Sequence, residues 1–397
     1  MNNVLDLFKG VGVIVDDSLY LRKNRGDIIR KIRNSFKKRN IPLFTYGRLP
    51  SNEEISHFNF ISFLLLDWDL HGFGSQLPQF LIDDNIDFIK QFNSVSFAPI
   101  FIFSNESKQD IVLKLTEAGL YDELKSNHIF VESKTELKDA QSLFSKIEDW
   151  VKQTPSIYVL KEWELALQQA KNSLFWDFYK IHPEWAKVLS ETFKNDGADI
   201  DSEFISIIYK NLIARTQTPI LEKDILKIEA EELTKEDLRK ILECERFLKQ
   251  NNLPPDVPAT GDIFKEEYQE DGETKYRYFV NIRPDCDIIR GGQDTELYCL
   301  KGRIVDEDRI NAEEKEKSIL FKNGCFEEKI AHAYISFIDG GKIVEFLFQD
   351  IKIKKWKSIK VNRIGRLLPP YITRLQQKYT FYLQRQALPA IPDRAIK

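Results

Sequence analysis

The stretch VGVIVDD, residues 11–17, is an apolar run that ends in two carboxylates. A second stretch, FLLLDWD at residues 63–69, repeats this pattern later in the chain. Short continuous apolar runs are typical of strands buried on both faces of a parallel sheet, and ligand sites in such sheets form where the strands end. We therefore expect the carboxylates of Asp16, Asp17 and Asp67 to meet at one edge of a parallel sheet.

Three carboxylates at one place repel one another unless a cation neutralises them. A hard cation such as Mg²⁺ prefers carboxylate oxygens and keeps coordination positions open for a phosphoryl oxygen and for water. The pattern therefore predicts a magnesium site formed by Asp16, Asp17 and Asp67, with phosphoryl transfer as its chemistry.

Two later apolar runs supply further polar groups. Residues 98–104, APIFIFS, end in the hydroxyl of Ser104, and residues 128–134, HIFVESK, lead to Lys134. A phosphoryl group on Asp67 would carry several oxygens that need partners. Mg²⁺, the Ser104 hydroxyl and the Lys134 ammonium can each bind one of them.

In this order the residues resemble the receiver domain of two-component response regulators. In that family an acidic pair follows the first strand, an aspartate the third, a serine or threonine the fourth and a lysine the fifth. The resemblance implies a flavodoxin-like, doubly wound five-stranded parallel sheet over residues 1–152. It further implies that Asp16 and Asp17 bind Mg²⁺ and that Asp67 accepts a phosphoryl group from a sensor histidine kinase. By the same resemblance, Ser104 is the switch hydroxyl and Lys134 pairs with the phosphoryl group.

Each of these residues also has a plainer interpretation. Asp16 and Asp17 could cap a helix that begins near Ser18, although a cap needs only one carboxylate. Asp69 could be the acceptor instead of Asp67, but the apolar run stops at Leu66, which places Asp67 first at the strand end. Ser104 and Lys134, taken singly, are ordinary turn and surface residues.

Composition and charge limit the class of protein. The 397 residues exceed one typical domain, and a hydrophobic content of 42% is enough for sizeable cores. With 58 basic and 62 acidic residues the net charge is −4, which gives no electrostatic bias toward nucleic acid. We expect a cytoplasmic protein without a membrane role, because there is neither a long apolar run nor an amino-terminal secretion signal. The four cysteines lack CxxC spacing and are expected to be reduced thiols.

A helical region is predicted at residues 153–252, as a connector or dimerisation region. Apolar residues recur there at helical spacing until Pro183, and further helices are expected at about 200–214 and 235–250. The region is rich in aromatic residues: Trp163, Phe175, Trp176, Phe178, Tyr179 and Trp185. They could form a tightly packed helical core, or a face for a second copy or another partner. The proline-rich stretch within 251–258 is predicted to be a linker.

Residues 259–397 are predicted to form a small antiparallel β domain with a carboxyl-terminal helix. Strands are expected at 276–282, 296–305, 330–338 and 342–348, with a hairpin turn at Asp339-Gly340-Gly341. The final helix is expected at 369–386.

Two features of this β domain could carry function. Cys286 and His332 could act as nucleophile and base, but the aspartates on either side of Cys286 would suppress thiolate formation. The plainer interpretation is a turn with a buried thiol. A basic stretch could contact nucleic acid phosphates, although a solvated strand face explains it as well. This stretch consists of Lys352, Lys354, Lys355, Lys357 and Lys360 with Trp356.

Two carboxyl-terminal strings, 363–371 and 382–386, resemble those of receiver proteins in bacterial anti-phage loci, and in particular the buffering response regulators of Detocs defence systems. In that family a sensor histidine kinase passes phosphate to two receiver proteins, one with a toxic output domain and one that absorbs stray phosphate. The resemblance implies a phosphate buffer and no enzyme beyond receiver chemistry. The alternative is a phosphorylation-gated effector whose carboxyl-terminal β domain binds a target or acts on a substrate.

Overall fold

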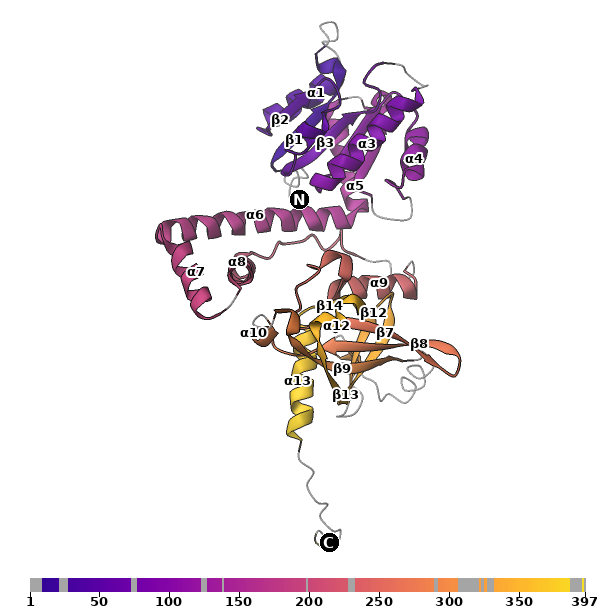
Figure 1. Ribbon diagram of the computed structural model, residues 1–397. Helices are drawn as coiled ribbons and strands as arrows, with labels where there is room; N and C mark the ends of the chain where they lie inside the picture. The colour runs from indigo at the N-terminus through magenta and orange to yellow at the C-terminus, as the bar shows by residue number, and fades with distance from the viewer. Residues whose placement is uncertain are drawn as a thin grey trace. The chain divides into compact units, whose positions relative to one another are not determined.

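The structure is a computed structural model with two compact units (Figure 1). It describes residues 9–20, 28–72, 77–122, 127–137, 139–197, 199–227, 233–288, 292–305, 321–322, 325–326, 332–385 and 395. The first unit consists of Met1–Pro183 and Ile208–Ile228, and the second of Glu184–Ile207 and Glu229–Lys397. The helical region therefore contributes to both units.

The first unit contains a parallel five-stranded sheet. Its strands are β1 (Val11–Val15), β2 (Leu43–Tyr46), β3 (Ile61–Asp67), β4 (Ile100–Ser104) and β5 (Ile129–Ser133). They lie in the order β2-β1-β3-β4-β5, and every neighbouring pair is parallel. This is the flavodoxin-like order of a doubly wound sheet, so the predicted fold of this part is confirmed.

Helices cover both faces of this sheet. Helices α1 (Ile28–Lys38) and α5 (Ala140–Gln153) pack on one face, and α2 (Asn52–Ile55), α3 (Gln79–Val95) and α4 (Lys108–Glu117) pack on the other. All seven residues of β3 are buried for this reason, which explains its unbroken apolar run. Each large apolar side chain buried here contributes roughly 1.5–3 kcal/mol.

Helix α6 (Pro155–Ile181) is fixed to the first unit by its amino-terminal half. Pro155 occupies the start of the helix, where its missing N–H costs nothing. Ile157 and Tyr158 join the apolar cluster formed with α1 and α5. The buried Lys161 ammonium donates to the carbonyl of Ser62 at 3.3 Å and forms an ion pair with Glu164.

The carboxyl-terminal half of α6 exposes its aromatic side chains. Phe175, Trp176 and Tyr179 are 54%, 59% and 75% exposed, so the interpretation as a tightly packed helical core is wrong for these three residues. Two helices follow, α7 (Trp185–Asn195) and α8 (Ile200–Arg215). An edge-to-face contact joins the rings of Phe193 and Phe204 in the second unit.

The second unit contains an antiparallel seven-stranded sheet in the order β12-β13-β9-β8-β7-β14-β6. Its strands are β6 (Phe247–Lys249), β7 (Asp262–Glu270), β8 (Glu273–Asn281), β9 (Glu296–Ile304), β12 (His332–Ile338), β13 (Lys342–Lys355) and β14 (Arg363–Leu367). Strands β10 (Phe321–Lys322) and β11 (Cys325–Phe326) form a separate pair. The short helices are α10 (Asp285–Ile288) and α12 (Trp356–Ile359). The predicted antiparallel sheet with a carboxyl-terminal helix, α13 (Tyr371–Gln384), is therefore confirmed.

Each face of this sheet has its own apolar cluster. Tyr278, Leu300 and Phe346 pack with Ile372 and Leu375 of α13 on one face. The opposite face carries Phe264, Phe279, Leu297, Cys299 and Trp356.

The helix predicted at 235–250 is shorter in the structure. Helix α9 (Lys235–Arg246) ends four residues earlier than predicted, because the next three residues pair with β14 as strand β6. Most of the segment between Asp69 and Ser96 is helix α3. Within the described ranges, every helix is too short or too polar to cross a membrane.

Candidate functional site

The predicted site residues lie at the carboxyl ends of neighbouring strands in the first unit. Asp16 follows β1, and Asp67 and Ser104 are the last residues of β3 and β4. Lys134 comes directly after β5. The strand register pairs Asp67 with Phe103 and Ser104 with Ser133, so these ends share one edge of the sheet. Parallel strands place their carboxyl ends together, and this geometry is why residues far apart in sequence converge here.

Three carboxylates come together at this edge. One oxygen from each of Asp16, Asp17 and Asp67 lies within 4.8 Å of the other two. Asp16 and Asp67 are buried and Asp17 is half-buried. Within the described part of the chain, this is the only group of three or more histidine, cysteine or acidic side chains close enough to hold a metal ion. An all-oxygen donor set of this kind suits a hard cation such as Mg²⁺.

Lys134 provides the positive charge among these carboxylates. Its ammonium donates to Oδ2 of Asp67 at 2.6 Å and to Oδ2 of Asp16 at 3.1 Å. Lys134 begins a 3-10 helix, η3 (Lys134–Glu136), whose first turn is capped by the hydroxyl of Ser133. One ammonium cannot balance three ionised carboxylates, so the site favours a further cation.

Burial is the largest single influence on the pKa values of Asp67, Asp17 and Lys134. It raises the pKa of Asp67 to about 7; Lys134 lowers this pKa and the charge of Asp16 raises it. Burial, followed by the charge of Asp16, also raises the pKa of Asp17. For Lys134, burial alone would lower the pKa, but Asp67 and Asp16 outweigh burial and raise it. A bound divalent cation would favour the ionised carboxylates.

The capping interpretation of Asp16 is also observed. Oδ1 of Asp16 accepts a hydrogen bond from the backbone N–H of Ser18 at 2.9 Å and caps the 3-10 helix η2 (Asp17–Leu19). Asp17 lies inside that helix and is not its cap. Capping therefore explains one oxygen of Asp16 and leaves the position of Asp17 unexplained.

Asp69 lies beside the carboxylate triad without being part of it. Its backbone N–H donates to Oδ1 of Asp67 at 3.2 Å, and its own side chain accepts from the backbone N–H of His71 at 3.3 Å. Asp69 adds only a minor contribution to the raised pKa of Asp17. The geometry therefore favours Asp67 over Asp69 as the residue at the centre of the site.

Ser104 is fully buried at the end of β4. Its hydroxyl oxygen accepts the backbone N–H of Glu106 at 3.1 Å, and a hydroxyl that accepts one bond keeps its own O–H for donation. Sequence reasoning did not single out Glu106. This carboxylate is buried, forms an ion pair with Lys114 at 2.7 Å, and leaves Oε2 without a hydrogen-bond partner among the described residues.

A buried amide also fixes the main chain beside Asp67. Asn85 of α3 donates its Nδ2–H to the carbonyl of Trp68 at 2.8 Å, and both residues are buried. The sequence signal for Asn85 is weak: one polar residue on an otherwise apolar helix face.

Cys286 and His332 are the candidate residues of the second unit, and the structure describes the side chain of Cys286 alone. Cys286 is exposed at the start of α10, so the expectation of a buried thiol is wrong. His332 begins β12, and its side chain lies outside the described residues. Among the cysteines whose side chains the structure describes, Cys299 is the buried one, and burial raises the pKa of its thiol to about 12, which makes it a poor nucleophile.

Four of the five lysines in the basic stretch form ion pairs with acidic side chains. Lys352 pairs with Asp350 at 3.0 Å, and Lys357 and Lys360 pair at 2.6 Å with Asp294 and Asp256. Lys354 forms an ion pair with Glu266. Trp356 is fully buried. These contacts favour the plainer interpretation over phosphate binding.

Comparison with known proteins found no matching family model and no significant match among curated proteins or solved structures.

Proposed function

We propose that the first unit accepts a phosphoryl group on Asp67 in a magnesium-dependent reaction. One observation carries the proposal: Asp67 ends a buried parallel strand inside a group of three carboxylates, with the Lys134 ammonium 2.6 Å from its Oδ2. A structural ion pair would need only one carboxylate for this lysine. Three buried or half-buried carboxylates cost stability and are retained where a cation and a substrate use them.

The donor in this proposal is the phosphohistidine of a sensor histidine kinase. An ionised oxygen of Asp67 attacks the phosphorus, a P–O bond forms, and the P–N bond to the imidazole breaks with its electron pair left on nitrogen. The product is an acyl phosphate on Asp67. Lys134 and the Ser104 hydroxyl would then donate hydrogen bonds to phosphoryl oxygens.

Asp16, Asp17 and Asp67 are the residues that would hold Mg²⁺. The ion would neutralise the carboxylates and the charge that develops on the phosphoryl oxygens. Because the burial of Asp67 raises its pKa to about 7, neutralisation also keeps its carboxylate ionised and nucleophilic at neutral pH.

We further propose that the chain is a phosphate buffer in a bacterial two-component phosphorelay of anti-phage defence, beside a second receiver protein that carries the toxic output. The matched charges around the basic stretch and the poor nucleophilicity of Cys299 support this choice over an effector that binds nucleic acid or uses that thiol. The anti-phage setting rests on the resemblance of the carboxyl-terminal strings alone.

The acceptor can be tested with a small phosphoryl donor. The purified protein is incubated with acetyl phosphate, with and without Mg²⁺, and its intact mass is measured. We expect one phosphoryl addition that requires Mg²⁺ and is abolished in Asp67→Asn. Asp69→Asn is the matched control, because this carboxylate neighbours Asp67 but lies outside the triad.

Each variant is checked by circular dichroism so that loss of labelling reports chemistry and not unfolding. Retained labelling of Asp67→Asn together with loss in Asp69→Asn would move the acceptor to Asp69. Equal labelling in chelator and in Mg²⁺ would remove the metal from the proposal.

A further inference from the structure

Residues 253–261 of the second unit, here called the strap, contain the proline-rich stretch predicted to be a linker. The strap connects a 3-10 helix, η4 (Gln250–Asn252), to strand β7. Three of its residues are prolines, which have no N–H and cannot join a sheet ladder as donors. Their carbonyl oxygens need donors from elsewhere if the strap is to be held in place.

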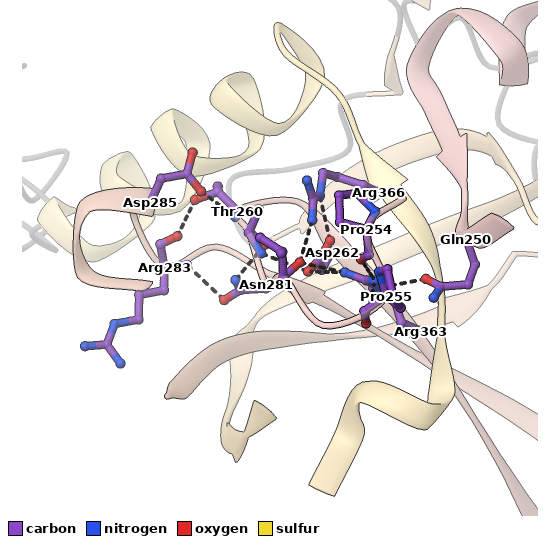
Figure 2. A network of polar contacts seen from close by, with 12 residues as sticks. Gln250, Pro254, Pro255, Thr260, Asp262, Asn281, Arg283, Asp285, Arg363 and Arg366 are labelled. Atoms are coloured by element: carbon purple, nitrogen blue, oxygen red, sulfur yellow. Dashed lines mark hydrogen bonds and ion pairs between the residues drawn. The ribbon is translucent and has the colours of Figure 1, made fainter. Parts of the chain in front are cut away.

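Arg363 of β14 supplies those donors (Figure 2). Its side chain is fully buried. Nη2 donates to the carbonyls of Pro254 at 2.5 Å and Pro255 at 3.1 Å, and Nη1 donates to the carbonyl of Val257 at 2.9 Å. Nη1 also reaches Asp262 at 3.3 Å, and Nε donates to Gln250 at 2.6 Å. One guanidinium therefore binds η4, the strap and β7 together.

Asp262 provides the negative charge beneath the strap. It is fully buried and accepts Arg366 Nε on Oδ1 at 2.7 Å. Its Oδ2 accepts the backbone N–H of Ala259 at 2.9 Å, in addition to Arg363. Arg366 also donates to the carbonyl of Val257 at 3.1 Å.

The carboxyl-terminal end of the strap is held by β8 and α10. Asn281 donates its Nδ2–H to the carbonyl of Ala259 at 2.9 Å, and the backbone N–H of Thr260 donates to Asp285 at 2.7 Å. The backbone of Gly261 bonds to Asn281 and to Leu367, each at 2.8 Å. The five N–H donors of Arg363 are all engaged with this chain. A polar cluster satisfied in this way fastens a segment and offers little to a ligand.

The helix before the strap is held to the same unit by buried charges. Glu243 of α9 accepts the backbone N–H of Gly341 at 2.6 Å, at the turn between β12 and β13. The guanidinium of Arg246 lies 4.6 Å from the ring centre of Tyr371, and the carbonyl of Arg246 accepts the N–H of Leu368 at 2.8 Å. Both charged residues are buried.

We propose that Arg363 is a clamp that keeps the strap closed, so that α9, β6 and the strap form one rigid body with the seven-stranded sheet. The proline-rich stretch is then not a hinge, and the rigid part of the second unit begins at Thr234, the cap of α9, instead of at residue 259. This inference does not depend on phosphorylation of Asp67.

Arginine is required at this position because of its donor geometry. A lysine ammonium has the same charge, but its three N–H donors lie on a single nitrogen atom. They cannot reach several separated carbonyls at once, as the planar guanidinium of arginine does. Arg363→Lys therefore keeps the charge beside Asp262 and removes the clamp.

The test is backbone hydrogen exchange of the full chain followed by mass spectrometry. In the unmodified protein we expect the strap amides that donate a hydrogen bond to be protected like those of β8; these are the amides of Leu253, Ala259, Thr260 and Gly261. In Arg363→Lys we expect strap amides to exchange at least about tenfold faster, with β8 unchanged, because the opening is local. Arg303→Lys is the matched control, since this arginine pairs with Glu345 at 2.7 Å on the same sheet but lies far along the chain from the strap and makes no contact with it among those described. The control should leave strap exchange unaltered.

A second variant covers the case in which Arg363→Lys does not fold. Gln250→Ala removes one acceptor of Arg363 and should accelerate exchange in the strap alone, by a smaller factor. The proposal would be overturned if these four hydrogen-bonded amides exchanged in the unmodified protein as fast as in an unfolded peptide. A folded variant in which the strap is unchanged, or one in which strap and β8 accelerate equally, would also overturn it.

Discussion

At the residue scale, Asp16 uses its two carboxylate oxygens for different purposes. Oδ1 caps η2 through the N–H of Ser18, and Oδ2 accepts the Lys134 ammonium at 3.1 Å. A substitution of Asp16 would therefore remove a cap, worth about 1 kcal/mol, along with the candidate metal ligand. Asp17 caps no helix and is half-buried. A substitution of Asp17 therefore tests metal binding with less effect on folding.

We predict that Asp17→Ala weakens Mg²⁺ binding at least about tenfold, because a hard cation loses one of three carboxylate ligands. Without metal the same variant should be slightly more stable, since one of several repelling carboxylates is gone. Isothermal titration with Mg²⁺ and thermal unfolding in chelator measure the two effects. Asp87→Ala, at an exposed position on α3, is the control and should change neither. An unaltered titration in Asp17→Ala would count against the metal site.

The raised pKa of Asp67 predicts a pH-dependent stability in the absence of metal. Its folded-state pKa of about 7 lies above its unfolded value near 4, so the folded state binds the proton more tightly. The resulting stabilisation is complete below about pH 4 and is lost as the pH rises through about 7. The shift sets an upper bound of about 4 kcal/mol, and Asp17 acts in the same direction.

Thermal unfolding in chelator between pH 4 and 8 checks this sign. The unmodified protein should lose stability relative to Asp67→Asn as the pH rises, because the amide does not titrate. Added Mg²⁺ should restore the unmodified protein at pH 8 and have little effect on the variant. Parallel pH profiles for the two proteins would show that the Asp67 carboxyl is not buried as described.

At the scale of elements, β6 depends on the absence of a side chain at Gly365. A Cβ at this position would lie 2.3 Å from the ring of Phe247 and 2.4 Å from the carbonyl oxygen of Leu248. Gly365→Ala should therefore displace β6 and destabilise the second unit by about 2 kcal/mol, as overpacking against backbone does. Urea unfolding measures the loss. Val361→Ala, at a side chain 81% exposed, is the control and should cost almost nothing. A tolerated alanine at 365 would contradict the close pairing of β6 with β14.

Strand β6 also shows which kind of strand cannot be predicted from the sequence. Strands β1, β3 and β4 were predictable because both faces of each are covered, which leaves an unbroken apolar run as the signal. Strand β6 was read as helix, since its three residues continue an apolar pattern and its pairing partner lies more than one hundred residues away. Local periodicity carries no information about such a partner.

The candidate site likewise contains residues that a local pattern predicts and residues that it does not. The convergence of Asp16, Asp67, Ser104 and Lys134 could be predicted because parallel strands share one carboxyl edge. Asn85 and Glu106 could not, because their contacts with Trp68, Ser104 and Lys114 follow no local sequence pattern. The strap was predicted to be a linker for a related reason: its prolines break helix and sheet, and the donors that Arg363 supplies come from a distant strand.

At the scale of the whole molecule, the chain joins an acidic site in one unit to a β unit that contains polar clusters whose groups bind one another. Asp262 with Arg363 and Arg366, and Asp339 with Lys265 and Tyr278, are examples in which charged or hydroxyl groups bind one another. Such clusters add rigidity and specificity to a fold. The contrast between the acidic site of the first unit and these internally bonded clusters of the second fits a protein whose function lies in the first unit, as proposed for a phosphate buffer.

The buffer proposal makes a prediction in cells that carry the complete phosphorelay. Asp67→Ala should make the partner effector more easily triggered without infection, because phosphate that Asp67 would absorb now reaches the effector. Cys286→Ala combined with His332→Ala should be nearly silent, since a buffer needs no chemistry from the second unit. Growth in the absence of phage and survival after phage challenge measure the two outcomes, with protein levels checked by immunoblot. Loss of defence in the double variant, with normal growth of Asp67→Ala cells, would instead make the second unit an effector, because only an effector needs those two side chains.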